Sequence, residues 1–318
     1  MEAGRRQVGR SRVTVPAIGF GTSGLGGMPD TYGYDVGEER ARATVRAVLA
    51  RPDGFLDASR IYGFGRSEAR IGAVVRELGG WPEGRVLSTK LDRDMATGRF
   101  DGPQARGSLV ESLAALGRDR VEILHLHDPE HARDLGEIDG ALAQLMRMRE
   151  EGLAGAVGLA ASRIEVMMPL VRAWDFDALI THNRWTLVNR NAGPLLALAA
   201  ERGIAVMNAA PYAGGALAKG AAHGRYVYQP ATEAMLAPVR RVEAICARHG
   251  VPPGALALQF SMREPRIAAT ICGVTRPERV AETLAWSGWP VPGAVWDEVL
   301  GLEFATDDPE ATRDYRPG

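Results

Sequence analysis

The chain has 318 residues, 46% of them hydrophobic and 24% charged, which is the composition of a globular protein and excludes a disordered chain or a fibrous repeat. This length suits one large domain or two ordinary ones. Lys and Arg number 38 against 39 Asp and Glu. Because the charges nearly cancel, neither nucleic acid nor an anionic membrane is expected as a partner.

Cysteine usage and the start of the chain bear on its compartment. Cys246 and Cys272 have no second pair to form a disulfide framework, which indicates a reducing environment. Four arginines lie among the first 12 residues, and no apolar run long enough for a signal peptide or a spanning helix follows them. We therefore expect a soluble, cytoplasmic protein. The basic start is expected to form a solvated surface strand, with a binding arm as the alternative.

Strand-like and helix-like runs alternate along the chain, a pattern typical of a parallel sheet covered by helices. Eight runs are short, apolar and rich in Val, Ile or Leu, as expected for strands buried on both faces. The predicted strands are Val15 to Thr22, Gly54 to Ser59, Arg85 to Leu91, Val121 to Asp128, Gly155 to Ala161, Asp177 to Asn183, Gly203 to Ala209 and Ala268 to Val274.

Between these runs the apolar spacing becomes that of a helix. Ile71, Val74, Val75 and Leu78 follow the i, i+3, i+4, i+7 pattern of one buried helix face. A doubled helix is predicted between Met235 and Met262. Eight β/α units in a chain of this length predict an α/β fold, a closed (β/α)8 TIM barrel that forms one domain over residues 1–318.

A two-domain, doubly wound sheet is the structural alternative. It requires a GxGxxG motif between a strand and a helix, and the chain has none in that setting. The glycine-rich stretch 19–27 leads into no convincing helix, so a phosphate cradle is not favoured there.

In a (β/α)8 barrel the functional groups gather at the carboxyl ends of the strands. Asp57, Lys90 and His127 each end a predicted strand, and Tyr62 lies in the loop five positions after Asp57. Because consecutive strands are neighbours, these residues are expected to converge on one quadrant of the barrel mouth. A structural ion pair and a buried core histidine are the alternative interpretation of the same residues.

The four residue types suggest acid/base chemistry. A buried lysine needs a carboxylate partner, and Asp57 is placed to pair with Lys90. A phenol held against that lysine is expected to ionise more easily, so that Tyr62 could exchange a proton with a substrate oxygen. His127 is expected to orient that oxygen by a hydrogen bond.

Together these residues resemble the aldo-keto reductases, a family of NAD(P)(H)-dependent (β/α)8 barrel oxidoreductases. The most specific stretch runs from Phe55 to Gly63, through Asp57 and Tyr62, and is followed by Ser67-Glu68 and Ile71-Gly72. Lys90 and His127 match the other two catalytic positions. The resemblance implies direct hydride transfer, with Tyr62 as acid/base, Asp57 and Lys90 tuning it, and His127 orienting the substrate.

The resemblance also implies a nicotinamide nucleotide lying across the barrel mouth. Arg279 matches an arginine near the 2′-phosphate, which favours NADP over NAD, because a guanidinium binds phosphate oxygens bidentately. Several positions depart from the family pattern. The segment Gly158 to Ser162 lacks the usual Ser-Asn pair that holds the carboxamide, and His182, Ala209 and Gly273 stand where glutamine, an aromatic residue and lysine are usual. The implied cofactor-binding residues are Gly21, Thr22, Asp57, His182, Tyr212, Gly214, Gly273, Thr275, Arg279, Glu282 and Thr283.

Within the family, four segments resemble the D-threo-aldose 1-dehydrogenase branch, which oxidises the anomeric carbon of a sugar to a lactone. These segments are His127 to Glu130, Gly214 to Leu217, Tyr226 to Tyr228 and Ile245 to Pro252. The expected partner is thus a small molecule, a sugar or a related carbonyl or alcohol.

Several residues near the mouth are candidates for substrate recognition. His182, Arg184 and Trp185 could bind sugar hydroxyls, with cofactor contacts or surface positions as alternatives. Because loops carry specificity on this scaffold, three segments are expected to shape the substrate pocket. They are Gly24 to Val36, Lys219 to Gln229 and the tail Asp307 to Gly318.

Two other functions compete with this interpretation. His125 and His127 lie two apart on one strand and so point to the same side, as the metal pair of a barrel hydrolase would. In that alternative His182 and Asp128 would add ligands, and the metal would activate water. Alternatively, the barrel binds a nicotinamide nucleotide without turnover, as a sensor or a subunit. The metal site is disfavoured because the pair ends the fourth strand rather than the first, Lys90 would place a positive charge beside the ion, and no Asp of the eighth strand closes the site. The intact set of four residues favours an enzyme over a sensor.

Overall fold

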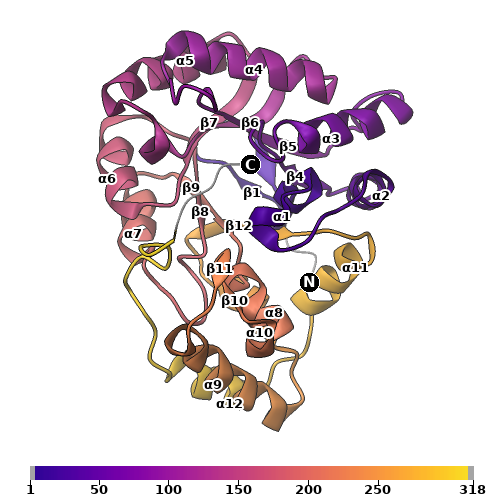
Figure 1. Ribbon diagram of the computed structural model, residues 1–318, viewed down its shortest axis with the longest axis vertical. Coiled ribbons are helices and arrows are strands. Elements are labelled where there is room, and N and C mark those ends of the chain that lie inside the picture. Colours follow the sequence, from indigo (N-terminus) through magenta and orange to yellow (C-terminus); the bar gives the residue numbers. More distant parts are fainter. Residues whose placement is uncertain (1–3, 314–318) are drawn as a thin grey trace.

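A closed barrel of eight parallel strands forms the centre of the computed structural model, which describes residues 4–313 (Figure 1). The strand order is β12-β3-β4-β5-β6-β7-β8-β9. The strands are β3 (Ile18–Gly21), β4 (Phe55–Asp57), β5 (Val86–Leu91), β6 (Val121–His127), β7 (Ala154–Ala160), β8 (Ala178–His182), β9 (Ala205–Ala209) and β12 (Ile267–Gly273). The predicted TIM barrel is confirmed, and every predicted run coincides with one of these strands apart from a few residues at its ends.

Helices surround the barrel (Figure 1). The longer ones are α2 (Glu38–Leu49), α3 (Arg66–Glu77), α4 (Gly102–Leu116), α5 (Ile138–Glu150), α6 (Ile164–Ala173), α7 (Gly193–Glu201), α9 (Glu233–His249), α10 (Pro253–Met262), α11 (Glu278–Ser287) and α12 (Gly293–Leu300), with short α1 (Pro29–Tyr32) and α8 (Ala216–Lys219) in loops. The predicted doubled helix is the pair α9 and α10, separated at Gly250, whose φ of 65° suits glycine.

Helix α3 shows how the apolar spacing positions a helix, and where the prediction fails. Ile71, Val74 and Val75 are buried against the barrel as the pattern predicts. Leu78, in contrast, is 51% exposed. The helix ends at Glu77 and Leu78 is its C-cap, so its side chain leaves the buried stripe.

A two-stranded hairpin, β1 (Arg6–Gln7) with β2 (Thr14–Val15), precedes the barrel. Both residues of β1 are exposed, as expected for a solvated surface strand. Val8 and Val15 are nonetheless buried, and they pack with Phe55, Val86 and other residues of the barrel strands in one apolar cluster. The hairpin therefore contributes to the core of the barrel through these two valines.

The register of the strands brings the candidate residues together. Gly21 pairs with Asp57 across β3 and β4, and Lys90 pairs with His125 across β5 and β6. Asp57, Lys90 and His127 thus lie at or near the carboxyl ends of three adjacent strands, which is the end where barrel enzymes carry their sites.

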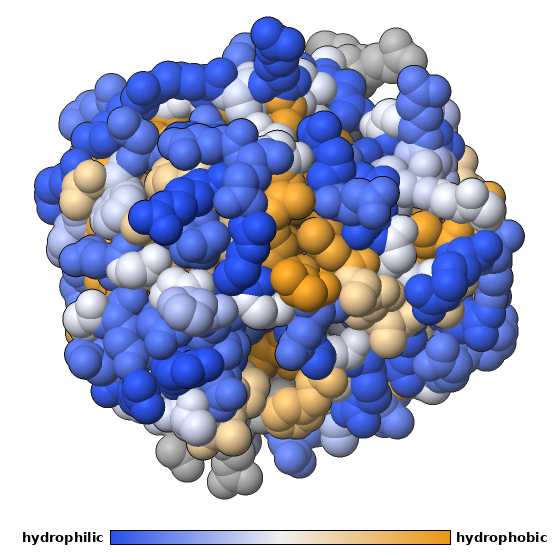
Figure 2. All heavy atoms as spheres, turned by 90° about the horizontal axis from the view of Figure 1, so that it is seen from above, coloured by the Kyte–Doolittle hydropathy of each residue, from blue (hydrophilic) through white to orange (hydrophobic). Residues whose placement is uncertain are grey.

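Three further observations concern membrane spans, the surface and the cysteines. Within residues 4–313 no helix combines the length and the apolar character needed to cross a membrane. The face seen in Figure 2 is mostly hydrophilic around a central group of hydrophobic residues. Cys246 and Cys272 are both buried free thiols.

Candidate active site

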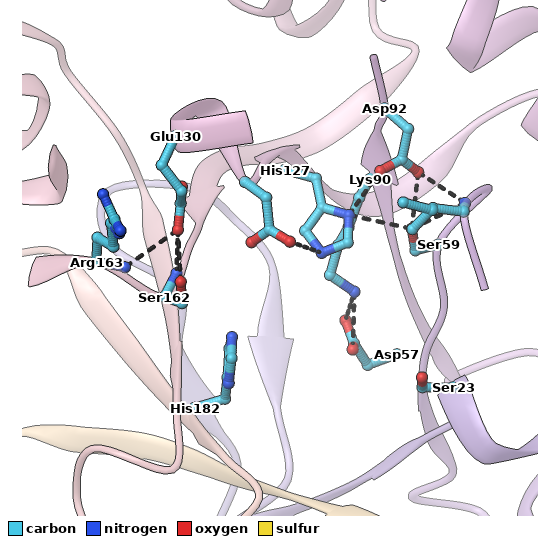
Figure 3. A network of polar contacts seen from close by, with 12 residues as sticks. Ser23, Asp57, Ser59, Lys90, Asp92, His127, Glu130, Ser162, Arg163 and His182 are labelled. Carbon is cyan, nitrogen blue, oxygen red and sulfur yellow. Dashed lines mark hydrogen bonds and ion pairs between the residues drawn. The ribbon is translucent and has the colours of Figure 1, made fainter. Parts of the chain in front are cut away.

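The centre of the site is a buried ion pair between Lys90 on β5 and Asp57 on β4 (Figure 3). Lys90 Nζ lies 3.0 Å from Asp57 Oδ1 and 2.9 Å from Oδ2, and it also donates to the Ala58 carbonyl at 2.7 Å. Lys90 is 1% exposed and Asp57 3%. Because three acceptors surround the ammonium group, the buried charge is compensated, as the sequence predicted.

Tyr62 lies in the loop between β4 and α3, beside this pair. Lys90 Nζ is 4.8 Å from the centroid of the Tyr62 ring, and the His127 ring meets it edge-on at 5.9 Å. Our expectation that this phenol ionises more easily than an ordinary tyrosine is wrong for this structure. Burial raises the pKa of Tyr62 well above 10, and the negative charge of Asp57 raises it further. The Tyr62 hydroxyl therefore holds its proton more tightly than an ordinary tyrosine.

His127 ends β6, and its ring is held by Asp92 and Ser59. Nδ1 lies 2.6 Å from Asp92 Oδ1 and 3.2 Å from Ser59 Oγ. The Ser59 hydroxyl in turn donates to Asp92 Oδ2 at 2.7 Å. Figure 3 shows Asp92 and Ser59 together on one side of the ring. Since the carboxylate occupies Nδ1, Nε2 is the nitrogen left for a substrate.

Asp128 follows His127 in a left-handed conformation with φ of 43°, which Asp tolerates better than most residues. Its Oδ2 is 3.6 Å from His127 Nε2. Burial alone would lower the pKa of His127, but the negative charges of Asp128 and Asp92 outweigh it, so the pKa is raised. His127 therefore holds a proton more tightly than a free imidazole does.

Sequence reasoning missed Asp92 and Ser59, which hold His127 in place. A signal was present, because each stands two positions past a predicted catalytic residue, Lys90 or Asp57. Both lie beyond the last residue of their strand, where the chain leaves the regular alternation of sides. Their direction therefore depended on loop geometry rather than on strand periodicity.

A cavity of about 660 Å³ opens above these residues, within the range of small-molecule and cofactor sites. All four predicted catalytic residues line it. The predicted cofactor residues that also line it are Gly21, Asp57, His182, Tyr212, Gly214, Gly273, Thr275 and Arg279. The tetrad, which is the set Asp57, Tyr62, Lys90 and His127, therefore shares one cavity with most of the predicted cofactor residues.

Thr22, Glu282 and Thr283 do not line the cavity. Thr22 is buried and donates to the Asp57 carbonyl at 3.0 Å, while Thr283 is buried on α11. Glu282 accepts a hydrogen bond from Arg279 at 2.6 Å. The structure thus places Thr22 and Glu282 behind residues of the wall.

Three neighbouring cations, Lys219, Arg276 and Arg279, line one part of the cavity, which we call the cationic end. Burial lowers the pKa of Lys219, and the positive charges of Arg279, Arg225 and Arg276 lower it further. Gly273 lines the same cavity, and a Cβ added there would meet no atom within 4 Å. Open space beside clustered cations fits the phosphates of a nucleotide, so the chain's residues suit a nicotinamide nucleotide.

Arg184 and Trp185 are not contacts for a substrate, contrary to one of our expectations. Arg184 is fully buried and pairs with Asp308 and Glu310 of the C-terminal segment. The Trp185 ring stacks against Phe260, with centroids 5.9 Å apart. Neither residue lines the cavity, whereas His182 does.

The loops expected to shape the pocket reach the cavity. Tyr32 and Tyr34, from the first of them, and Tyr228, from the second, line it together with Arg313 from the tail. The Tyr32 and Tyr228 rings meet at 5.8 Å, edge to face. The part of the predicted tail at residues 314–318 lies outside the described residues.

The metal alternative depends on His125, which is buried beneath this site. Its Nδ1 lies 3.2 Å from Ser88 Oγ. Burial and the nearby charge of Lys90 lower its pKa well below 6.5. Within residues 4–313 no three His, Cys, Asp or Glu side chains are grouped to hold a metal ion. The surroundings of His125 therefore do not support the interpretation of this site as that of a metal-dependent hydrolase.

Comparison with known proteins places this site in a family. Residues 17–299 match the model of the Aldo/keto reductase family. D-threo-aldose 1-dehydrogenase of a Pseudomonas species is 30% identical over 61% of this chain, an alignment that spans 60% of that relative. Pyridoxal 4-dehydrogenase of Microbacterium luteolum is 26% identical over 92% of this chain and 95% of its own. L-galactose dehydrogenase of Arabidopsis thaliana is 27% identical over 88% of this chain and 86% of its own.

Solved structures agree with the fold. An aldo-keto reductase from Bacillus halodurans in its holo form has a TM-score of 0.77 at 18% identity, over 98% of this chain and 100% of that one. A glycerol dehydrogenase from Gluconobacter oxydans has a TM-score of 0.72 at 19% identity, over 94% of each chain. The chain belongs to the aldo/keto reductase family, whose members are oxidoreductases that act on alcohol and carbonyl groups.

Proposed function

We propose that this protein is an NAD(P)(H)-dependent oxidoreductase that oxidises an aldose at C1 to a lactone or reduces a related carbonyl. The observation that carries the proposal is that Asp57, Tyr62, Lys90 and His127 line the same cavity as the neighbouring cations Lys219, Arg276 and Arg279. The tetrad thus offers acid/base groups to a substrate oxygen, and the cationic end offers cations to the phosphates of a cofactor.

Tyr62, His127 and Lys90 would have different roles in the reaction. When bound, the nicotinamide nucleotide supplies the hydride acceptor or donor. In reduction, the Tyr62 hydroxyl donates its proton to the carbonyl oxygen, and His127 Nε2 hydrogen-bonds the same oxygen. In oxidation the proton returns to the Tyr62 oxygen, and the positive charge of Lys90 beside the ring stabilises the phenolate that accepts it.

The cofactor would lie along the cavity, from the tetrad to the cationic end. Gly21 and His182 would contact the nicotinamide half, with Thr22 supporting the wall behind it. Tyr212, Gly214, Gly273 and Thr275 would line the path of the nucleotide. We propose NADP as the preferred form, because Arg279 belongs to the cationic end and offers a fork for a 2′-phosphate. Glu282, on the same helix as Arg279, would hold the guanidinium through their hydrogen bond, and Thr283, buried on that helix beside Tyr212, would support the cavity wall.

A sugar is the proposed substrate class. Two of the relatives are named for aldose and galactose oxidation. The cavity near Tyr62 is lined by aromatic and polar side chains, among them Tyr32, Tyr228, Asp128 and His182. Rings that pack against the faces of a sugar and polar groups that bind its hydroxyls are the combination such a ligand needs.

The test follows nicotinamide absorbance with NAD and NADP supplied separately, and with L-fucose, D-arabinose and a panel of aldehydes as substrates. Tyr62→Phe keeps the ring and removes the hydroxyl, so it should nearly abolish turnover while nucleotide binding, measured by fluorescence, stays almost intact.

Sugar oxidation that depends on Tyr62 would support the aldose assignment. Turnover of aldehydes alone, with reduced cofactor, would support the roles of the four catalytic residues and contradict the assignment of a sugar as the substrate. Full activity of Tyr62→Phe would contradict the acid/base role of this residue.

A further inference from the structure

Two carboxylates flank His127, one at each ring nitrogen. Asp92 Oδ1 is 2.6 Å from Nδ1, and Asp128 Oδ2 is 3.6 Å from Nε2. An ionised carboxylate accepts hydrogen bonds but donates none, so the contact at Nδ1 requires a proton on that nitrogen. The second carboxylate is too distant for a hydrogen bond, but its charge favours a proton on Nε2 as well.

The Asp92 carboxylate is immobilised and ionised. It is 3% exposed, and its Oδ2 accepts hydrogen bonds from Ser59 Oγ at 2.7 Å and from the Ile61 N–H at 3.0 Å. Its own backbone N–H donates to Ser108 Oγ at 2.9 Å. Burial would raise the pKa of Asp92, but the charge and hydrogen bond of His127 lower it overall. Asp92 therefore remains a fixed negative charge directed at the ring.

The other ionisable groups around the ring do not cancel this effect. Lys90 on β5 opposes a charge on His127, but it is itself paired with Asp57. Burial and Lys90 keep His125, two positions earlier on β6, neutral. Tyr62, whose ring meets His127 edge-on, is also neutral because burial raises its pKa. The carboxylates at the two ring nitrogens therefore set the charge of His127.

We propose that Asp92 is a positioning residue that holds His127 doubly protonated and directs its Nε2–H toward the substrate oxygen in the cavity. This role rests on the proposed function. Hydride addition to a carbonyl leaves negative charge on its oxygen, and an imidazolium N–H stabilises that charge more than a neutral N–H does. His127 keeps its proton in this step, because the Tyr62 hydroxyl supplies the proton that the oxygen receives.

The decisive variant is Asp92→Asn, which keeps the shape of the side chain and removes its charge. The matched control is Asp94→Asn, two positions later, where the side chain accepts hydrogen bonds from Thr97 in an exposed turn. Both variants lose one negative charge, but only Asp92 contacts the ring. The first readout is the NMR titration of the His127 Cε1–H, assigned with His127→Gln, which needs no turnover.

We expect the His127 midpoint to lie above 6.5 in the wild-type protein and at least one pH unit lower in Asp92→Asn. Asp94→Asn should leave the midpoint where it is. An unchanged midpoint in Asp92→Asn, or a wild-type midpoint below 6.5, would overturn the proposal.

Steady-state kinetics of carbonyl reduction supply the second readout. The kcat should fall as pH rises through the His127 midpoint, and Asp92→Asn should move this limb to lower pH by the shift that NMR shows. Above both midpoints kcat should be about tenfold lower for a shift of one pH unit, with KM for the nucleotide unchanged. An equal loss at every pH would show a merely structural role and count against the proposal.

The two readouts separate this inference from the proposed function. If the wild-type protein turns over nothing with either nucleotide, the proposed function fails and the catalytic part of the role fails with it. The protonation of His127 by Asp92 is still decided by the NMR midpoints.

Discussion

Arg184 Nη1 donates to Glu310 Oε1 at 3.1 Å and so joins two residues 126 positions apart in the chain. The Arg184 side chain is fully buried, and it also pairs with Asp308. The segment that Arg184 binds follows α12 and runs past α7 along the side of the barrel (Figure 1). His182 Nδ1 lies 3.4 Å from Glu310 Oε1 and lines the cavity, so the tail supports the cavity wall from behind.

Removing Arg184 should destabilise the protein and loosen this segment. Arg184→Met would remove the fully buried cation that Asp308 and Glu310 share and leave Glu310 with Arg313 at 2.8 Å. Breaking a buried pair typically costs about 3 to 5 kcal/mol of unfolding free energy, and the remaining Arg313 should keep the loss at or below that range. Urea unfolding measures the loss, and proteolysis after α12 should accelerate. Arg240→Gln, which breaks an exposed pair with Glu233 on α9, is the control and should lose less than about 1 kcal/mol. Equal losses in the two variants would refute this account of the tail.

Variants of Lys90 and Asp57 should show that the two residues affect stability and catalysis in different ways. Lys90→Met should lower kcat at least about 100-fold, and it should also destabilise the fold by leaving Asp57 charged and buried. Adding Asp57→Asn should recover most of the unfolding free energy, because the uncompensated charge is removed, but no activity. Chemical denaturation and initial rates of the wild-type protein and the two variants measure this. Recovered turnover in the double variant would show that the pair serves structure alone.

Arg279 should make the affinity for NADP higher than the affinity for NAD. Arg279→Ala should raise the Kd for NADP far more than that for NAD, because only NADP carries the phosphate that the guanidinium would bind. Titration of tyrosine and tryptophan fluorescence measures both constants. Arg248→Ala removes an arginine that pairs with Glu298, and it should change neither. Losses of equal size for both nucleotides would exclude Arg279 as the phosphate ligand.

Glu68 should make stability depend on pH. It is buried on α3 and accepts a hydrogen bond from Thr89 at 2.6 Å, and burial raises its pKa to about 7. Its pKa in the unfolded chain is about 4.3, so the folded state holds the proton more tightly. The contribution of Glu68 is therefore most favourable below pH 4 and is lost as pH rises to about 7.

Glu68→Gln removes this dependence and keeps an acceptor for Thr89. The variant should gain about 3 kcal/mol relative to the wild-type protein between pH 4 and pH 8, measured by urea unfolding at each pH. A stability difference that is the same at both pH values would contradict the raised pKa.

The sequence by itself determined the barrel and the place of its chemistry. The spacing of apolar residues identifies strands and helices, because the buried face of each element is recorded in the order of the residues within that element. Asp57, Lys90 and His127 could be found because a closed parallel barrel brings the ends of successive strands to one rim. Once the strands were assigned, proximity of these three side chains followed from topology.

Only the tertiary structure decided the contacts and charges of individual groups. Asp92 reaches His127 across 35 residues, and Arg184 turns from the mouth toward carboxylates more than 100 positions away. The alternation of side chains along a strand does not predict where either side chain points, because both residues follow the end of a strand. The pKa of Tyr62 rises although Lys90 is beside it, because burial of the hydroxyl outweighs the neighbouring charge. Burial and long-range charge depend on every element around a group, and only the assembled barrel supplies them.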